Sequence, residues 1–217
     1  MTVDLLVAGG GMAGMAAAAR AIELGLEVVV ADKGDEVGGS AALSAGIVWT
    51  APDVETARRV APEGDPALLR ALVEGFDAAI ERVRDAGVVV SERWSGQMGF
   101  GVAHHVDLSS LLEHYRAPMA GAWSTRTTVA ELRVDGDGAV CGALLDGPDG
   151  PIEVAARAVL LATGGFQGDA ELVGRLVGWG AERMPVRSNP GSVGDACGWG
   201  GPRALRSAPR WTASTAT

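Results

Sequence analysis

Residues 7–14 read Val-Ala-Gly-Gly-Gly-Met-Ala-Gly, between an apolar run at residues 3–8 and a helix-like run at residues 12–24. A second apolar run at residues 27–31 follows, and Asp32 comes directly after it. A strand, a glycine-rich turn, a helix and a second strand in this order are typical of the βαβ unit that binds dinucleotides. The sequence therefore predicts an α/β chain with a Rossmann-like nucleotide-binding domain.

The three spaced glycines of the turn have different predicted roles. Gly9 lets the chain turn sharply as it leaves the strand, and Gly14 lets the helix lie close to the sheet. Gly11 has no Cβ, so the backbone can approach a pyrophosphate, and a larger residue there is expected to strain the turn. The free N–H groups of Met12 and Ala13, at the positive end of the helix, would then face the phosphates.

Asp32 follows the turn at close to the spacing of about 20 residues that is typical of a ribose-binding carboxylate. Such a carboxylate accepts hydrogen bonds from ribose hydroxyls. Its negative charge disfavours a 2′-phosphate, so NADP is the least expected ligand.

The composition argues against several classes of function. The chain has 217 residues, 47% of them hydrophobic, which is enough for a sizeable core. A net charge of −9 and the absence of a basic cluster argue against a nucleic-acid partner. No uncharged apolar run approaches about 18 residues, so no membrane span is expected. Two distant cysteines, and a first strand that leaves no room for a signal peptide, predict a cytoplasmic protein.

The middle of the chain is predicted to be helical, and the part after residue 125 to form a sheet. Asp65 and Pro66 open a long helix that ends at Gly87. Its buried apolar stripe should consist of Leu69, Leu72, Val73, Phe76, Ile80 and Val83. Later runs alternate with a period of two, which predicts a three-stranded meander at residues 127–134, 139–145 and 152–155, and a separate strand at 158–162.

This order of elements favours one kind of nucleotide-binding domain over another. An NAD domain would continue with further βαβ units, whereas a meander in place of the later crossover suits FAD. The predicted FAD-binding domain comprises residues 1–50 and 125–196. A mainly helical insertion occupies residues 51–124, and residues 197–217 form an atypical tail.

Four segments together resemble the flavoprotein family of fumarate reductases and succinate dehydrogenases, with its 3-ketosteroid dehydrogenase-like relatives. The segments are residues 9–14, 32–33 with 38–46, 162–166, and 189–195. The first occurs in many flavin and NAD enzymes, but the set in this order is specific. The resemblance implies FAD-dependent oxidation or reduction of a carbon–carbon bond in an unsaturated or saturated acid or a ring ketone. It also allows for an electron-transfer partner or a homo-oligomer.

The resemblance further implies which residues contact the cofactor. Those at the pyrophosphate would be Gly9, Gly11, Met12, Ala13 and Gly14. Those at the adenosine would be Asp32, Lys33, Val129, Ala162, Thr163 and Gly164. Those at the flavin end would be Gly38, Gly39, Ser40, Ser44, Ala45 and Gly46, with Asp195 near the ribityl chain.

Departures from the family pattern bear on attachment and on catalysis. Some family members carry a flavin-linking histidine where this chain has Ser40, so the resemblance implies noncovalent FAD. The family's catalytic residues follow a Gly-Asp-Gly element, which here ends in Ala196, so the catalytic residues are unknown and the C-terminal part would be missing. Residues 197–217 hold three arginines and no acidic residue, which indicates either a shifted reading frame or a divergent tail.

Three functions stay open on these grounds. They are an FAD-dependent oxidoreductase, a non-catalytic nucleotide-binding fragment or half that needs a partner chain, and an NAD-binding domain, which the meander disfavours. The three histidines lack carboxylates or cysteines at ligand spacing, so no metal site is expected. Arg126 and Arg187 are interpreted as solvated surface groups. Trp199 and the other scattered tryptophans are expected to pack in the core or at an interface.

Overall fold

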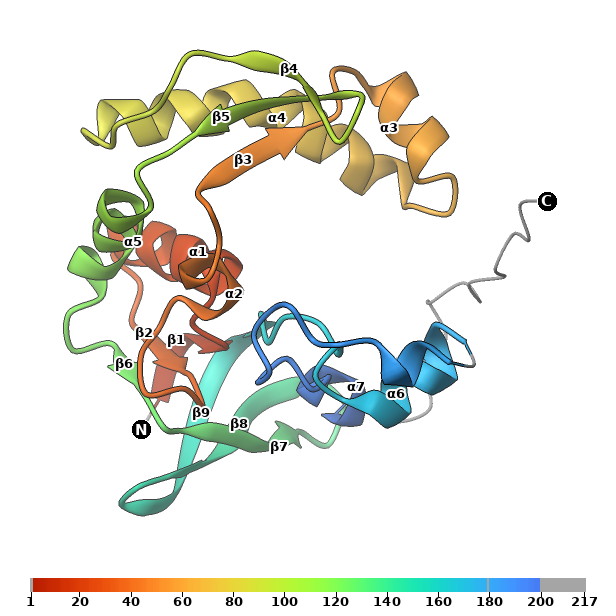
Figure 1. Ribbon diagram of the computed structural model, residues 1–217. Helices are drawn as coiled ribbons and strands as arrows, with labels where there is room; N and C mark the ends of the chain where they lie inside the picture. Colours follow the sequence, from red (N-terminus) through yellow and green to blue (C-terminus); the bar gives the residue numbers. More distant parts are fainter. Residues whose placement is uncertain (1, 179, 200–217) are drawn as a thin grey trace. The chain divides into compact units, whose positions relative to one another are not determined.

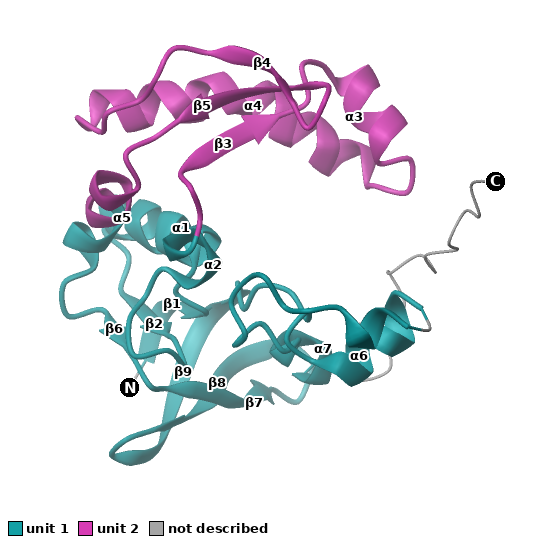
Figure 2. Cartoon of the chain, in the orientation of Figure 1, with its two compact units in different colours: residues 1–43, 115–217 teal, residues 44–114 magenta. Residues whose placement is uncertain are grey.

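The computed structural model describes residues 2–178 and 180–199, and its elements are labelled in Figure 1. Figure 2 shows the two compact units into which the chain divides. Unit 1 comprises residues 1–43 and 115–217, and unit 2 comprises residues 44–114. Each unit has its own sheet.

Unit 1 contains a six-stranded sheet in the order β6-β2-β1-β9-β8-β7. Its strands are β1 (Thr2–Ala8), β2 (Val28–Ala31), β6 (Trp123–Ser124), β7 (Thr128–Val134), β8 (Val140–Gly147) and β9 (Gly150–Leu161). The pairs β1–β2, β1–β9 and β2–β6 are parallel, whereas β7, β8 and β9 form an antiparallel meander. This is the α/β, Rossmann-like arrangement with a meander that the sequence predicts.

β9 is one strand of 12 residues where the sequence predicted two. It pairs antiparallel with β8 from Gly150 to Ala155, and parallel with β1 from Ala155 to Leu161. The predicted break was wrong because Ala155 and Ala156 pair in register with Thr2 and Val3 on β1. The meander and the parallel strands are therefore joined through one continuous strand.

The helices of unit 1 begin with α1 (Met12–Glu23), which agrees with the prediction. The chain leaves this helix at Gly25, whose φ is +78°, as expected of a glycine that ends a helix. The remaining helical segments are α2 (Gly39–Ala42), η1 (Ala117–Met119), α6 (Ala170–Leu176), η2 (Ala181–Arg183) and α7 (Asp195–Trp199). The sheet buries a core cluster of apolar residues that includes Leu6, Val129 and Val154.

Unit 2 contains a three-stranded antiparallel sheet that the sequence did not predict. Its strands, in the order β3-β5-β4, are β3 (Ile47–Thr50), β4 (Trp94–Gln97) and β5 (Gly101–His105). Its helices are α3 (Val54–Val60), α4 (Pro66–Asp85) and α5 (Leu108–Arg116), the last of which crosses the boundary at residue 114. The strands are short and glycine-rich around the β4–β5 turn, so they carry too little alternation to stand out.

The long helix of unit 2 begins as predicted. Asp65 accepts hydrogen bonds from Ala67 N–H and Leu68 N–H, which caps α4. The predicted apolar stripe is buried only along the second half of the helix, because Leu72 is 58% exposed. In the residues that the structure describes, no helix is both long enough and apolar enough to cross a membrane.

Candidate functional site

The chain turns sharply after β1, as Gly9 predicts. Gly9 has a φ of +104°, and a Cβ there would lie 2.4 Å from the backbone oxygen of Ala162. The Gly9 N–H donates to Ala31 O, at the end of β2, over 2.8 Å. An L side chain is strained at this φ, and the oxygen it would meet is backbone. Gly9 therefore brings β1, β2 and the segment after β9 together.

Gly14 brings α1 against the same turn. A Cβ at Gly14 would lie 1.9 Å from Gly9 O and 3.1 Å from a methyl carbon of Val7. The predicted role of Gly14 in close packing between helix and strand is confirmed. Glycine at this position lets the helix begin directly above the turn.

Gly11, in contrast, borders open space. A Cβ built there finds no atom within 4 Å. Its φ of −75° and ψ of −175° are extended backbone that any residue can adopt. The expected strain of a larger residue at Gly11 was therefore wrong. What glycine leaves here is empty space beside the N-terminus of α1.

The N-terminus of α1 has no side-chain cap. Gly11 is the N-cap residue and offers no side chain, and the first turn of α1 holds no acidic residue. By contrast, Asp53, Asp65 and Asp169 cap α3, α4 and α6. The first N–H groups of a helix have no partner within it, and the helix dipole places positive charge there. This end of α1 is therefore suited to an anion such as a phosphate.

A cavity of about 570 Å³ lies within unit 1 at this end of α1. Its volume is in the range of small-molecule and cofactor sites. The predicted cofactor residues that line it are Gly9, Gly11, Met12, Ala13, Asp32, Lys33, Gly39, Ser40, Val129, Ala162, Thr163, Gly164 and Asp195. The fold thus brings segments from both ends of the described chain to one site.

Two other predicted residues of unit 1 do not line the cavity. Gly14 supports the turn, as described above. Gly38 is the N-cap of α2, with a φ of +131°, and its N–H donates to Gly10 O over 2.7 Å. Gly14 and Gly38 therefore support the glycine turn that lines the cavity without lining the cavity themselves.

Ser44, Ala45 and Gly46 belong to unit 2 and are not among the residues that line the cavity of unit 1. Ser44 Oγ accepts a hydrogen bond from Gly46 N–H over 3.2 Å, and Gly46 has a φ of +74°. The structure thus gives these residues a tight turn before β3. Their contact with the flavin end stays a prediction.

Asp32 holds two loops at the edge of the cavity. Its Oδ2 accepts a hydrogen bond from Gly10 N–H over 2.6 Å, and its Oδ1 accepts one from Gly34 N–H over 2.7 Å. Sequence reasoning assigned this carboxylate to a ribose and missed the bracing role. Each carboxylate oxygen can accept a second hydrogen bond, so both roles are compatible.

Lys33 and Asp195 form an ion pair between residues that both line the cavity. Lys33 Nζ and Asp195 Oδ2 are 2.5 Å apart, and the side chains are 33% and 21% exposed. The pair joins the loop after β2 to the first residue of α7. A partly exposed pair of this kind contributes about 0–1 kcal/mol to stability.

Sequence reasoning missed part of the lining. The missed residues are Ala31, Gly34, Glu36, Ala41, Thr127, Thr128, Asn189, Gly191, Ser192 and Trp199. Asn189 Oδ1 accepts a hydrogen bond from Gly191 N–H over 2.8 Å, in the segment 189–195 that carries the resemblance but from which only Asp195 was assigned a contact. For Trp199 the sequence held no signal. It packs against the core cluster, as expected, but also lines the cavity.

Thr163 gives an independent reason to expect a polar ligand. Its Oγ1 is buried and has no hydrogen-bond partner among the described residues, yet the residue lines the cavity. A buried hydroxyl left without a partner costs about 1–3 kcal/mol. A polar ligand group would remove this cost. Together with the space at Gly11, the uncapped helix and Asp32, this residue set fits a dinucleotide.

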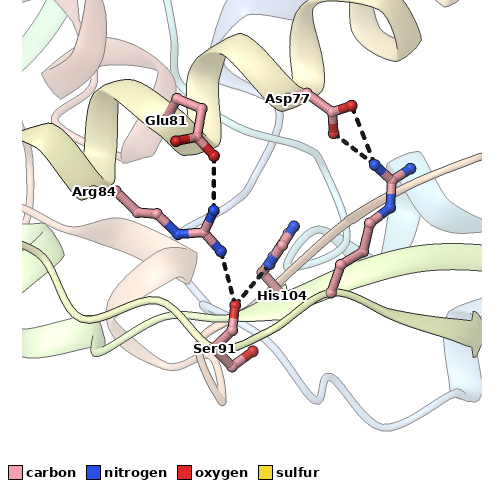
Figure 3. A network of polar contacts seen from close by, with 6 residues as sticks. Asp77, Glu81, Arg84, Ser91 and His104 are labelled. Atoms are coloured by element: carbon pink, nitrogen blue, oxygen red, sulfur yellow. Dashed lines mark hydrogen bonds and ion pairs between the residues drawn. The ribbon is translucent and has the colours of Figure 1, made fainter.

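The three histidines belong to unit 2. The most buried of them, His104, is held in place by packing and hydrogen bonds (Figure 3). His104 is 5% exposed, and its ring stacks on Phe76 at 6.0 Å between centroids. His104 Nδ1 lies 2.9 Å from Ser91 O, which also accepts a hydrogen bond from Arg84 Nη2 over 3.0 Å. These contacts join β5, α4 and the segment before β4.

The other side chains considered for chemistry are dispersed. Arg126 has a φ of +51°, and its backbone N–H donates to Gly34 O over 2.8 Å, while Arg187 is exposed. Across residues 2–178 and 180–199, no group of three or more His, Cys, Asp and Glu side chains is placed to hold a metal ion. Residues 200–217 of the predicted atypical tail lie outside the described residues.

Known proteins are similar to this chain in sequence and in fold. Fumarate reductase (cytochrome) of Shewanella frigidimarina is 31% identical over 224 aligned positions, which cover 89% of this chain and 38% of the relative. The open conformation of a flavocytochrome c3 fumarate reductase superposes with a TM-score of 0.79 at 22% identity, over 90% of this chain and 39% of that one. 3-Ketosteroid-delta4-(5alpha)-dehydrogenase of Rhodococcus jostii RHA1 superposes with a TM-score of 0.74 at 19% identity, over 90% and 52%.

These similarities establish the fold and show how much of each relative's length the chain covers. The chain spans 38% of the length of the Shewanella relative, and at these identities the two solved structures show the fold alone. The family model described as the FAD binding domain matches residues 4–123, which is more than half of the chain. By this match, with the glycine turn and cavity described above, the chain belongs to the FAD binding domain family.

Proposed function

We propose that unit 1 binds FAD noncovalently in this cavity, and that the chain is the FAD-binding part of an oxidoreductase acting on carbon–carbon bonds. The observation that carries the proposal is the open space at Gly11 beside the uncapped N-terminus of α1. Family membership makes FAD the dinucleotide to expect there. The unpartnered hydroxyl of Thr163 supplies a further polar contact at the same cavity.

In this proposal each part of the cavity holds a different part of the cofactor. Gly11, Met12 and Ala13 bind the pyrophosphate, and Asp32 accepts hydrogen bonds from the adenosine ribose. Ser40 lies toward the flavin end. Ser40 stands where some family members carry a flavin-linking histidine, which supports noncovalent attachment. Bound flavin would supply the hydride chemistry, exchanging a hydride with one carbon of the substrate's carbon–carbon bond.

The proposed substrate is a small unsaturated or saturated acid or a ring ketone. Support comes from the relatives, which are named as a fumarate reductase and a 3-ketosteroid dehydrogenase. The proposal includes an electron-transfer partner or a second copy of the chain. The residues that bind substrate and transfer its proton are not assigned.

A second candidate function is a nucleotide-binding part that turns over only with a partner chain. This alternative is compatible with the extent of the match, in which the chain spans 38% of the Shewanella relative. Under this alternative the cavity still binds FAD. The two functions differ in steady-state activity.

Reconstitution with FAD tests the cofactor assignment. The purified chain is incubated with FAD, freed of unbound flavin, and examined for the visible absorption of flavin. Acid precipitation should then release all flavin into the supernatant. Flavin that stays with the precipitate would contradict noncovalent attachment, and a chain that takes up NAD but no FAD would contradict the assignment itself.

We expect the 217-residue chain to bind FAD weakly and to show no reductase or dehydrogenase turnover. The ionisable side chains among the described lining residues are Asp32, Lys33, Glu36 and Asp195. Asp32 already accepts two backbone hydrogen bonds, Lys33 and Asp195 are paired, and Glu36 is exposed. We therefore expect none of these four side chains to act as the acid or base that transfers a substrate proton.

The measurement is an anaerobic assay with a reduced dye and several unsaturated acids. A turnover number in the ordinary enzymatic range of roughly 1–10³ per second would contradict this expectation. It would direct attention to His104, His105, Arg126 and Arg187 as sources of catalytic groups.

Replacing Asp32 with alanine should weaken FAD binding by about 1–3 kcal/mol, the range for a lost hydrogen bond to a charged acceptor. The ribose loses its acceptor, and the N–H groups of Gly10 and Gly34 lose the carboxylate that positions them. Titration calorimetry measures the change. Asp35→Ala, at an exposed acid three residues further on, is the matched control. Equal FAD affinities in the two variants would contradict the assignment of Asp32 as the ribose-binding residue.

A further inference from the structure

Ala31, Val129 and Trp199 form an apolar wall on one side of the cavity. All three line the cavity, and all three also belong to the core cluster of the sheet or pack against it. Ala31 and Val129 are nearly fully buried, whereas Trp199 is half-buried. The indole of Trp199 therefore has one part against the core and another part on the cavity.

The apolar wall lies beside the proposed ribose-binding acid. The Thr127 N–H donates to the backbone oxygen of Asp32 over 2.9 Å, which places the start of β7 next to the end of β2. Val129 follows two residues later. Trp199 lies on the same short helix as Asp195, which is paired with Lys33 next to Asp32. A base attached to a ribose at Asp32 would therefore lie against the wall.

We propose that the indole of Trp199 stacks on the adenine of the bound nucleotide and makes the cavity selective for adenine nucleotides over a flavin mononucleotide. This inference rests on the proposed function. A purine has two flat apolar faces and a polar edge, which suits a half-buried indole on an otherwise apolar wall. Stacking of this kind is worth enough to change affinity severalfold or more.

Two variants and one matched control test the proposal by calorimetry. Trp199→Ala should raise the Kd for FAD and for ADP by about 5- to 150-fold, the fold-change that corresponds to one lost base–aromatic stack. The Kd for FMN, which has no adenine, should not change. Trp199→Phe should retain most of the affinity. Trp123→Phe, on β6 of the same unit and outside the cavity lining, should leave all three ligands unaffected.

A fluorescence measurement separates stacking from a merely structural role. ADP should quench part of the tryptophan emission of the wild-type chain. In Trp199→Phe this quenching should disappear while calorimetry still detects bound ADP. If Trp199→Ala fails to fold, the quenching result in Trp199→Phe decides the question.

The outcomes distinguish this inference from the proposed function. A wild-type chain that binds neither FAD nor ADP overturns both. A chain that binds FAD, but in which quenching persists in Trp199→Phe, overturns the stacking role alone. Equal loss of FAD and FMN affinity in a folded Trp199→Ala variant overturns it as well, because loss of packing does not discriminate between ligands.

Discussion

Replacing Gly11 with valine is expected to abolish measurable FAD binding and to leave the fold intact. The side chain would occupy the open space at the uncapped end of α1 that the pyrophosphate needs. The backbone at Gly11 is extended, so a β-branched residue fits it without strain. Loss of glycine at an N-cap should cost only about 1 kcal/mol of stability. Calorimetry measures the binding, and thermal unfolding measures the fold.

Gly136→Val is the matched control for Gly11→Val. Gly136 lies between β7 and β8, and a Cβ there also finds no atom within 4 Å. This variant should bind FAD as the wild type does. Wild-type affinity in Gly11→Val would mean that the phosphates lie elsewhere, and the assignment of the cavity would fail with it.

Replacing Gly14 with alanine is expected to affect the fold itself, with a loss of about 3 kcal/mol or more in the free energy of unfolding. The new Cβ would lie 1.9 Å from Gly9 O, so α1 or the turn must move. Because the clash is with backbone, no side-chain rotation relieves it. The higher helix propensity of alanine returns only about 1 kcal/mol. Chemical denaturation measures the free energy of unfolding.

Gly75→Ala provides the control for Gly14→Ala. Gly75 lies inside α4, and its added Cβ finds no atom within 4 Å. The same substitution should there stabilise the chain by up to about 1 kcal/mol. Equal stabilities in the two variants would contradict the close approach of α1 to Gly9.

Local sequence was enough to predict the βαβ unit, because each of its signals lies within a few residues. The turn at Gly9 and the close packing at Gly14 are confirmed by the structure. β9 was predicted as two strands because it changes partner along its length, from the neighbouring strand β8 to the distant strand β1, which periodicity does not report. The sheet of unit 2 was missed because strands of four or five residues carry little alternation.

The candidate site likewise contains residues that a local motif encodes and residues that only tertiary packing places. Gly11 and Asp32 were predicted from a motif whose spacing encodes their positions. Trp199 was not, because its place on the cavity wall depends on how α7 packs against the sheet. The hydrogen bonds of Asp32 to Gly10 and Gly34 were missed for a similar reason, since they depend on loop geometry.

The continuous strand β9 also determines the order in which the protein can be assembled on the ribosome. Thr2 pairs with Ala155, and Ala8 pairs with Leu161. At about 5–20 residues per second, the nascent chain carries β1 for about 8–30 s before β9 emerges. Throughout this interval one edge of β1 has no partner, and Gly9 has no Ala162 beside it. The glycine turn is therefore translated well before the strand that completes it, and one edge of the apolar strand β1 stays unpaired in the nascent chain until β9 has emerged.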